Sequence, residues 1–288
     1  MKQLFLLLSL AFMSTIHAGE LINKTIEVQS PKNILIDNLR GDIEIFGWDK
    51  NKIVIKGELD DSAKSLVVKN KGHKVYIKVK MKGDSHSGDG SDLKVYIPAS
   101  TSLWFKGVDT SFSFNDLNAG IEGRTINGDL VIKNVKTKIK ASTVSGDVNI
   151  INSNGYAHIE SVTGTIVLSG KYQEAYIKSM SGEIKSTIDQ IQNLTTENVS
   201  GHTAIQGILQ NKAQIKLSSV SGAIKYKSKG KLNAACELKS QFGGQIKNKI
   251  TQDQPKRSML KQELNFMSGD GSGNLIISTV TGSVSIED

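Results

Sequence analysis

A glycine-rich stretch between residues 84 and 92 holds the densest group of potential metal ligands in the sequence. It carries three carboxylates, Asp84, Asp89 and Asp92, among serines and glycines. Calcium takes several hard oxygen ligands at flexible turns, so the stretch is a candidate Ca²⁺ loop. Its match to the glycine–aspartate repeat of calcium-binding β-rolls is partial and occurs once. A solvated hairpin loop without metal is the simpler alternative, and the sequence predicts no other cofactor.

Two runs of alternating lysines could bind an anionic surface. Alternation at period two places the lysines of each run on one side of a strand, and stacked strands could combine them into a basic stripe. Such a stripe would attract acidic polysaccharide or lipopolysaccharide. The alternative is a role in solubility and in the protection of sheet edges. The two runs are Lys136, Lys138 and Lys140, and Lys225, Lys227 and Lys229.

The net charge of +8 arises almost entirely from lysine, since the only arginines are Arg40, Arg124 and Arg257. Arginine is the residue that makes bidentate contacts with phosphates and base edges. The composition therefore indicates diffuse attraction to an anionic envelope polymer, or contact with another envelope protein. We expect no nucleic-acid partner.

Residues that could support catalysis are few and scattered. Histidines show no metal-ligand spacing, and there is no G-x-S-x-G motif. Cys236 lies on the apolar side of an alternating segment, which predicts a buried, inert thiol. Asp42, Asp129 and Asp147 occupy equivalent turn positions and could stack in a row, as in a polysaccharide-active β-helix enzyme. The sequence favours a non-catalytic protein and leaves that enzyme as the alternative.

The elements that must position these side chains are short strands in a repeat. A typical unit reads Val-Ser-Gly-Asp-Val at residues 144–148, and successive glycines from Gly128 to Gly222 are 18, 18, 18, 19 and 21 residues apart. Glycine permits the sharp turn between strands. Alternation at period two places the valine and isoleucine side chains of these short strands on one face. So short a unit can bury that face only by stacking on its neighbours.

This spacing predicts an all-β fold, namely a single right-handed parallel β-solenoid, or β-helix. A sandwich of antiparallel hairpins is the competing fold. Residues 19–100 are less regular and are expected to form capping strands at the N-terminal end. Residues 101–288 are expected to form the regular repeats, with a loop insertion near residues 251–265. The final repeat would then end the rod, with Glu287 and Asp288 opposing end-to-end pairing and keeping the protein a monomer.

Residues 1–18 read as a signal peptide. Lys2 precedes an apolar run from residue 4 to residue 12, and Ala18 precedes a plausible cleavage point. The run is too short to span a membrane, and no later stretch is long and apolar enough. We therefore expect an exported protein without a transmembrane segment after cleavage, located in the periplasm or on the cell surface.

Several segments resemble the adhesin-like β-strand-repeat family, a bacterial domain of unknown function in exported proteins. The similar segments are residues 38–49, residues 95–99, the V-[ST]-G series, and residues 271–282. Together they cover most of residues 26–288. The resemblance implies a β-solenoid scaffold at the cell envelope, and it supplies no catalytic residues.

Overall fold

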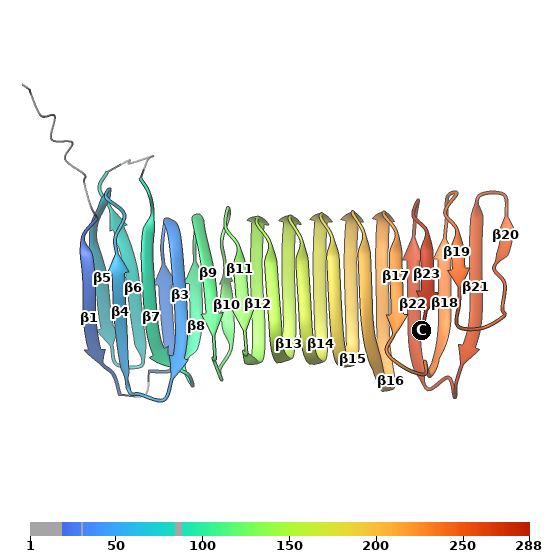
Figure 1. The fold of residues 1–288 in the computed structure, drawn as a ribbon, viewed down its shortest axis with the longest axis horizontal. Helices are drawn as coiled ribbons and strands as arrows, with labels where there is room; N and C mark the ends of the chain where they lie inside the picture. The colour runs from blue at the N-terminus through green and yellow to red at the C-terminus, as the bar shows by residue number, and fades with distance from the viewer. Residues whose placement is uncertain (1–18, 30, 84–87) are drawn as a thin grey trace, which may run out of the picture.

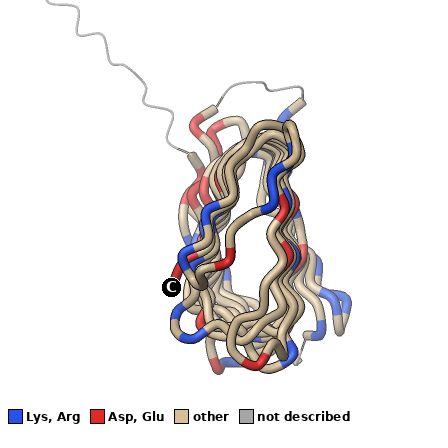
Figure 2. The backbone as a smooth tube through the Cα atoms, turned by 90° about the vertical axis from the view of Figure 1, so that its right-hand side faces the viewer, with Lys and Arg blue, Asp and Glu red and all other residues tan. Residues whose placement is uncertain are grey.

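The protein forms a long, flattened tube of β-strands. The computed structural model describes residues 19–29, 31–83 and 88–288. Over these residues it contains 23 strands in one continuous sheet and no helix (Figure 1). Viewed along the tube, the coils superimpose on a narrow oval with two long sides (Figure 2). We call the side that contains β8, β10 and β12 sheet A, and the side that contains β3, β9 and β11 sheet B.

The centre of the rod is a stack of parallel coils. Each of four long strands runs first through sheet B and then through sheet A: β13 (Val148–Thr163), β14 (Ile166–Ser181), β15 (Ile184–Ser200) and β16 (Thr203–Ser221). Shorter strands precede them in sheet A, namely β8 (Ser102–Lys106), β10 (Ile121–Arg124) and β12 (Lys136–Ser145). In sheet B the stack includes β9 (Asp109–Asn115), β11 (Leu130–Lys133) and β17 (Ile224–Ser228). Every pairing among these strands is parallel.

The repeat spacing sets the register of this stack. One repeat step places Ile132, Ile150 and Leu168 in line on adjacent strands, and all three are fully buried. Gly164 has a φ of +108°, and a Cβ on it would clash with the carbonyl oxygen of Gly146. The repeat glycine is therefore required by both the turn and the contact between coils.

The apolar residue that begins the V-[ST]-G motif points outward in the central coils, away from the face that Val148 and Ile150 share. These side chains are between 39% and 49% exposed: Ile126, Val144, Val162, Met180, Val199 and Val220. The preceding residue points inward instead, and it is small and polar. At one corner the Thr143 hydroxyl donates to the Gly128 carbonyl oxygen at 3.2 Å. A polar side chain suits this inner corner because it satisfies carbonyl groups at the turn.

At the N-terminal end, the order of strands in space departs from their order in the chain. β2 (Asn33–Asp37) lies between β6 (Lys74–Met81) and β8, and β3 (Arg40–Trp48) lies between β7 (Ser91–Pro98) and β9. Beyond them, β5 (Ala63–Lys71) pairs antiparallel with β6 and ends sheet A. In sheet B, β4 (Lys52–Glu58) and then β1 (Leu21–Glu27) continue from β7 in antiparallel pairs.

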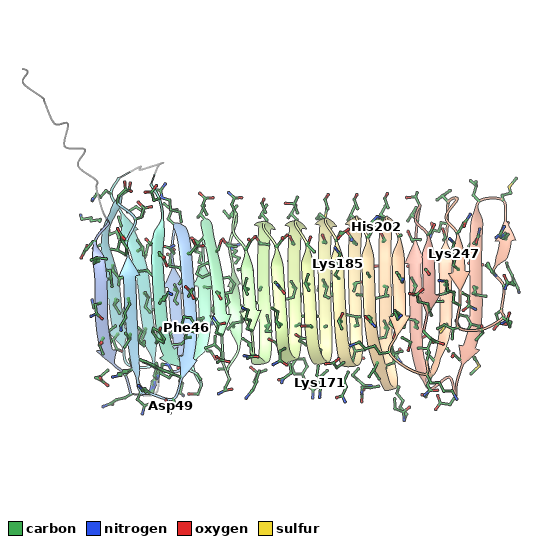
Figure 3. The ribbon with its side chains drawn as sticks, in the orientation of Figure 1. Phe46, Asp49, Lys171, Lys185, His202 and Lys247 are labelled. Carbon is green, nitrogen blue, oxygen red and sulfur yellow. The ribbon has the colours of Figure 1, made fainter. Side chains whose placement is uncertain are left out.

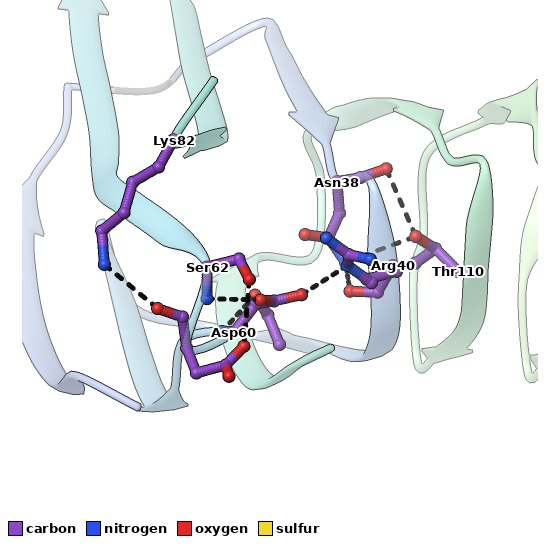
Figure 4. Close-up of polar contacts among 8 residues, drawn as sticks. Asn38, Arg40, Asp60, Ser62, Lys82 and Thr110 are labelled. Carbon is purple, nitrogen blue, oxygen red and sulfur yellow. Dashed lines mark hydrogen bonds and ion pairs between the residues drawn. The ribbon is translucent and has the colours of Figure 1, made fainter. Parts of the chain in front are cut away.

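A buried ion pair connects β3 to the segment that follows β4. Arg40 Nε lies 2.6 Å from Asp60 Oδ2, and only 1% of the Asp60 side chain is exposed (Figure 4). The other Asp60 oxygen accepts a hydrogen bond from the Ser62 amide at 2.7 Å. On the opposite side, Asn38 and Thr110 join the end of β2 to β9 through hydrogen bonds of 3.2 and 3.3 Å (Figure 4). Arg40 therefore anchors the N-terminal strands.

At the C-terminal end, the last part of the chain is also inserted. β22 (Gly273–Thr279) lies between β16 and β18 (Ala234–Ser240), and β23 (Val284–Glu287) lies between β17 and β19 (Ile246–Asn248). A hairpin of β20 (Lys256–Ser258) and β21 (Lys261–Ser268) ends sheet A, so the expected loop insertion at 251–265 contains strands.

This topology corrects the expectation that the final repeat ends the rod. Because β23 is paired on both sides, its carboxylates cannot protect an open edge. Glu287 instead forms ion pairs with Lys225 of β17 and with Lys249 beyond β19, at 2.5 and 3.2 Å. The Glu287 carboxylate connects two coils.

The all-β prediction is confirmed. Parallel pairing holds in the centre, whereas antiparallel strands end sheet A on both sides and sheet B at the N-terminal end, so the sheet is mixed and the expectation of a wholly parallel solenoid was too simple. The expected signal peptide at residues 1–18 lies outside the described residues. Within the described part of the chain, no helix is long and apolar enough to cross a membrane.

Candidate functional site: a groove on sheet A

Outward side chains of sheet A form two rows along the rod, because parallel register aligns equivalent positions of successive strands. Figure 3 shows side chains recurring from coil to coil at the turns. The first row, which we call the aromatic row, comprises Tyr76, Leu35, Trp104, Glu122, Lys140, His158 and Tyr176. The second, the charged row, comprises Lys78, Asp37, Lys106, Arg124, Ser142, Glu160 and Lys178.

Three adjoining hollows follow these rows, and we call them together the sheet A groove. The central hollow, of about 580 Å³, is lined by residues of both rows from Trp104 to Glu160. Trp104 also borders a smaller hollow of about 240 Å³ that extends to Tyr76. Lys106 and Arg124 border a third, of about 540 Å³, which reaches the outward valine positions at the corner. The groove therefore combines aromatic, cationic and apolar surface.

Glu122 is the acidic group at the centre of the groove, and lysines neutralise it. Its carboxylate oxygens lie 3.2 Å from Lys140 Nζ and 3.5 Å from Lys138 Nζ. Burial acts to raise the pKa of Glu122, but the hydrogen bonds and charges of Lys140 and Lys138 outweigh burial and hold the pKa below its ordinary value. Glu122 is thus an ionised partner of lysines and a poor candidate for a proton donor at neutral pH.

Lys106 and Arg124 are neighbours in the charged row, on paired strands β8 and β10. Both side chains are exposed, and no carboxylate lies within ion-pair distance of either among the described residues. Like charges at directly paired positions repel each other across a sheet. An anion placed between the two side chains would relieve that repulsion.

A stacked pair of rings lies at the far end of the groove, where only His158 of the pair lines the central hollow. The centroids of His158 and Tyr176 are 4.8 Å apart with an interplanar angle of 29°. His158 contacts Glu160 at 3.0 Å, and the Tyr176 hydroxyl donates to Glu197 at 3.0 Å. Burial, together with Glu197, raises the pKa of Tyr176 to about 12, so the phenol stays protonated. These contacts hold both rings in place on the sheet surface.

The lysines singled out from the sequence do not form one stripe. Lys138 and Lys140 lie on the outer face of sheet A, where they pair with Glu122. Lys225 and Lys227 lie on sheet B, and their register neighbours there include Ala204 and Gln206 but no further lysine. Lys136 lies on a hollow at the other corner, and Lys229 pairs with Asp189 at 3.1 Å. Their outward orientation was predictable, whereas their stacking was not.

The candidate calcium loop is only partly described. Asp84 lies outside the described residues, while Asp89 and Asp92 are exposed. Asp92 lies on β7, where its register partners are Asp42 and Glu58. Among the described residues, no group of three or more histidine, cysteine or acidic side chains could hold a metal ion.

The turn carboxylates are occupied by backbone hydrogen bonds. Asp129 Oδ1 accepts from the Asp147 amide at 2.8 Å, and Asp147 Oδ1 accepts from the Thr165 amide at 2.7 Å. Asp42 is separated from Asp129 by the coil that contributes Ser111. Asp129 and Asp147 therefore stack as expected, but as links between coils.

Cys236 is buried, as predicted, with 3% of its surface exposed. Burial raises the pKa of its thiol to about 12. A thiol that is protonated and enclosed at neutral pH is unsuited to nucleophilic chemistry.

The fold and these repeats can be compared with known proteins. The family model described as Toastrack DUF4097 matches residues 31–286. The chain belongs to this Toastrack family. Its members are classed as a domain of unknown function, in line with the resemblance noted in the sequence. A search of curated proteins found no match.

Solved structures also resemble the Toastrack chain. A protein provisionally described as an adhesin from Parabacteroides merdae has a TM-score of 0.53 at 15% identity, covering 94% of this chain and 97% of the other. An adhesin so described from Bacteroides fragilis has a TM-score of 0.45 at 14% identity, with 93% and 97% covered. A protein provisionally described as lipid-binding, from Parabacteroides distasonis, has a TM-score of 0.45 at 15% identity, with 93% and 96% covered. The first likeness supports the fold alone.

Sequence reasoning missed most of the groove. Trp104 and Arg124 belong to strands that are one repeat apart, and the pattern of the repeat already aligned positions 106 and 124. Aligning outward positions by the repeat step would have brought Lys106 beside Arg124. Nothing in the local sequence indicated that β2 and β6 would add Leu35 and Tyr76 to the same row.

Proposed function

We propose that this Toastrack protein is exported and acts as a non-catalytic, adhesin-like binding scaffold of the cell envelope, in the periplasm or on the cell surface. The observation that carries the proposal is the sheet A groove, which places aromatic and cationic side chains from several coils on one continuous surface. A rigid stack of coils presents such a surface without rearrangement, which lowers the entropic cost of binding. The provisional description of similar structures as adhesins names the same kind of role.

We propose a non-catalytic role because the carboxylates of the groove centre and of the stacked turns already form ion pairs or hydrogen bonds within the protein. Glu122 is paired with lysines, and the oxygens Asp129 Oδ1 and Asp147 Oδ1 accept backbone amides. A glycoside hydrolase needs two carboxyl groups about 5–10 Å apart across the scissile bond, one of them able to donate a proton. We also propose that the coils wind in a right-handed direction, which an experimental structure would test. We propose further that the protein is a monomer, which light scattering would test.

Retention by isolated cell envelopes tests the proposed function. The mature protein, residues 19–288, is mixed with envelopes of the bacterium that makes it and sedimented. Ser142→Trp places a large ring in the central hollow and should abolish most of the retention. Ser113→Trp introduces the same ring on the outer face of sheet B and should leave retention unchanged.

Release of reducing sugar ends is measured in the same mixtures, and none is expected. Failure of the unmodified protein to sediment with envelopes would overturn the proposed function. Equal loss in both tryptophan variants would show that the groove is not the binding surface.

A further inference from the structure

We propose that the sheet A groove binds a linear acidic polysaccharide, with a sugar ring stacked on Trp104 and an anionic group of the polymer held between Lys106 and Arg124. The inference rests on the proposed function and names the class of ligand that the same groove takes.

Trp104 supplies the platform. Its side chain is 48% exposed on the outer face of sheet A, although it borders two hollows. Leu35 and Tyr76 continue the same row on the two strands beyond it. A half-exposed indole on a flat sheet offers an apolar face with a polar edge, which suits a sugar ring that has one apolar face and hydroxyl groups at its rim.

Lys106 and Arg124 supply the anion site next to that platform. On β8, Lys106 follows Trp104 by two residues and therefore shares its face of the strand. Arg124 is the register partner of Lys106, and its planar guanidinium can bind a carboxylate or sulfate in a bidentate manner. A sugar ring stacked on Trp104 would thus direct its acidic substituent toward Lys106 and Arg124. Neither cation forms an ion pair with a carboxylate of the described residues.

The shape of the groove favours a linear polymer. Its lining residues come from seven neighbouring strands: β6, β2, β8, β10, β12, β13 and β14. At a spacing of about 4.8 Å between strands, six steps cover roughly 29 Å along the rod. The groove is lined by five cations and two carboxylates, namely Lys74, Lys106, Arg124, Lys140 and Lys178, and Glu122 and Glu160. A long anionic chain complements that length and charge.

A peptide fits the same surface less well. The central strands are hydrogen-bonded on both sides, so they offer no edge to which an extended peptide could add as a strand. Lipid is the other class that the apolar corner could attract, and it is included in the test.

The experiment measures affinity of the mature protein for three acidic polymers, polygalacturonate, alginate and dextran sulfate, and for neutral dextran, by isothermal titration calorimetry. Measurements are made at low salt and at roughly 0.5 M salt, where exposed charges are screened. We expect binding to at least one acidic polymer, weakened by salt, and much weaker binding to dextran. Vesicles of phosphatidylglycerol serve as the lipid probe.

Variants separate the two parts of the site. Arg124→Gln should weaken binding about 10-fold at low salt and flatten its salt dependence, because a charge-assisted contact is lost. Trp104→Ala should weaken binding about 10-fold at both salt concentrations, and Trp104→Phe should restore most of it. Lys247→Gln, an exposed cation on β19 of sheet B, is the matched control and should bind like the unmodified protein.

Three results would overturn the inference: no binding to any acidic polymer, binding of dextran equal to that of its sulfated form, or a loss in Lys247→Gln as large as that in Arg124→Gln. Tighter binding of vesicles that displaces the polymer would assign the groove to lipid instead. If envelope retention remains sensitive to Ser142→Trp while the acidic polymers fail to bind, the ligand class is wrong and the proposed function stands.

Discussion

The centre and the ends of the rod are built by different rules. In the centre, each coil pairs with the coil that precedes it in the chain, one repeat away. At the ends, partners are distant in sequence: β2 pairs with β6, and β16 pairs with β22, although other strands intervene along the chain in both cases. Polar contacts differ too, since the centre relies on hydrogen bonds at its turns and the N-terminal end on a buried ion pair.

This difference indicates where the fold needs contacts that specify the register of its strands. Identical coils in the centre could slip past one another by a whole repeat, because each buries the same kind of side chain. Unique contacts at the ends oppose such a slip. Antiparallel strands also cover the last parallel strands of both sheets at the N-terminal end and of sheet A at the C-terminal end, which limits pairing with other molecules there.

The largest expected effect comes from removal of the inserted C-terminal coil. Deletion of residues 269–288 takes away β22 and β23, the parallel partners of β18 and β19. Since repeat structures are stabilised by nearest neighbours, residues 232–268 should lose most of their protection from amide hydrogen exchange, whereas residues 139–200 should keep theirs. Protection retained by residues 232–268 would show that the cap folds independently of that coil.

A smaller but still large effect is expected from the buried ion pair. Arg40→Met leaves the Asp60 carboxylate enclosed without its partner and should lower the free energy of unfolding by about 3–5 kcal/mol. Urea unfolding provides the measurement. Arg257→Met, at an exposed position in β20, should change stability by less than about 0.5 kcal/mol. A loss under about 1 kcal/mol in Arg40→Met would contradict the role of this pair in holding the N-terminal end.

The smallest effect concerns Glu287 and pH. Hydrogen bonds from Lys225 and Lys249 lower the pKa of Glu287 from its ordinary value of 4.5. A carboxylate whose pKa is lower in the folded state stabilises that state fully above the unfolded pKa, and the contribution is lost as pH falls through the folded pKa. The stability difference between the unmodified protein and Glu287→Gln should therefore be constant near pH 7 and shrink below about pH 4.5.

Urea unfolding at several pH values tests this, with Asp288→Asn as the control. Because Glu287 lies between two coils, its neutralisation should affect stability and leave light scattering unchanged. Association of Glu287→Gln at neutral pH would restore the idea that this carboxylate protects an edge.

The centre of the fold could be predicted from the sequence because its information is local. The nearly constant repeat step and the glycine at residue 164 define both the turn and the register. The outward valine follows from the same alternation, because Ala157, Ile159 and Ser161 point inward and therefore Glu160 and Val162 point outward. Insertion of the terminal coils, by contrast, was inaccessible, because pairing between strands that are far apart in the chain leaves no periodic signal.

The candidate site divides in the same way. Cys236 and the stacked Asp129 and Asp147 followed from their positions in the repeat. The lysine runs suggested a basic stripe because alternation places the lysines of each run on one side of a strand. The two runs do not combine, because alternation does not say which side of the rod each strand joins. The sequence around Trp104 does not indicate a binding site. Its part in the sheet A groove arises from neighbours on other coils.

The inserted final coil also governs the order in which the molecule can be completed. Residues 273–287 are synthesised after β16 to β21, yet they fill the space between β16 and β17 on one side and β18 and β19 on the other. Strands β18 to β21 therefore cannot join the central stack until residues 273–287 have been synthesised. A chain interrupted before residue 273 would leave that space empty and the hairpin of β20 and β21 detached, which makes synthesis of residues 273–287 a condition for closing the rod.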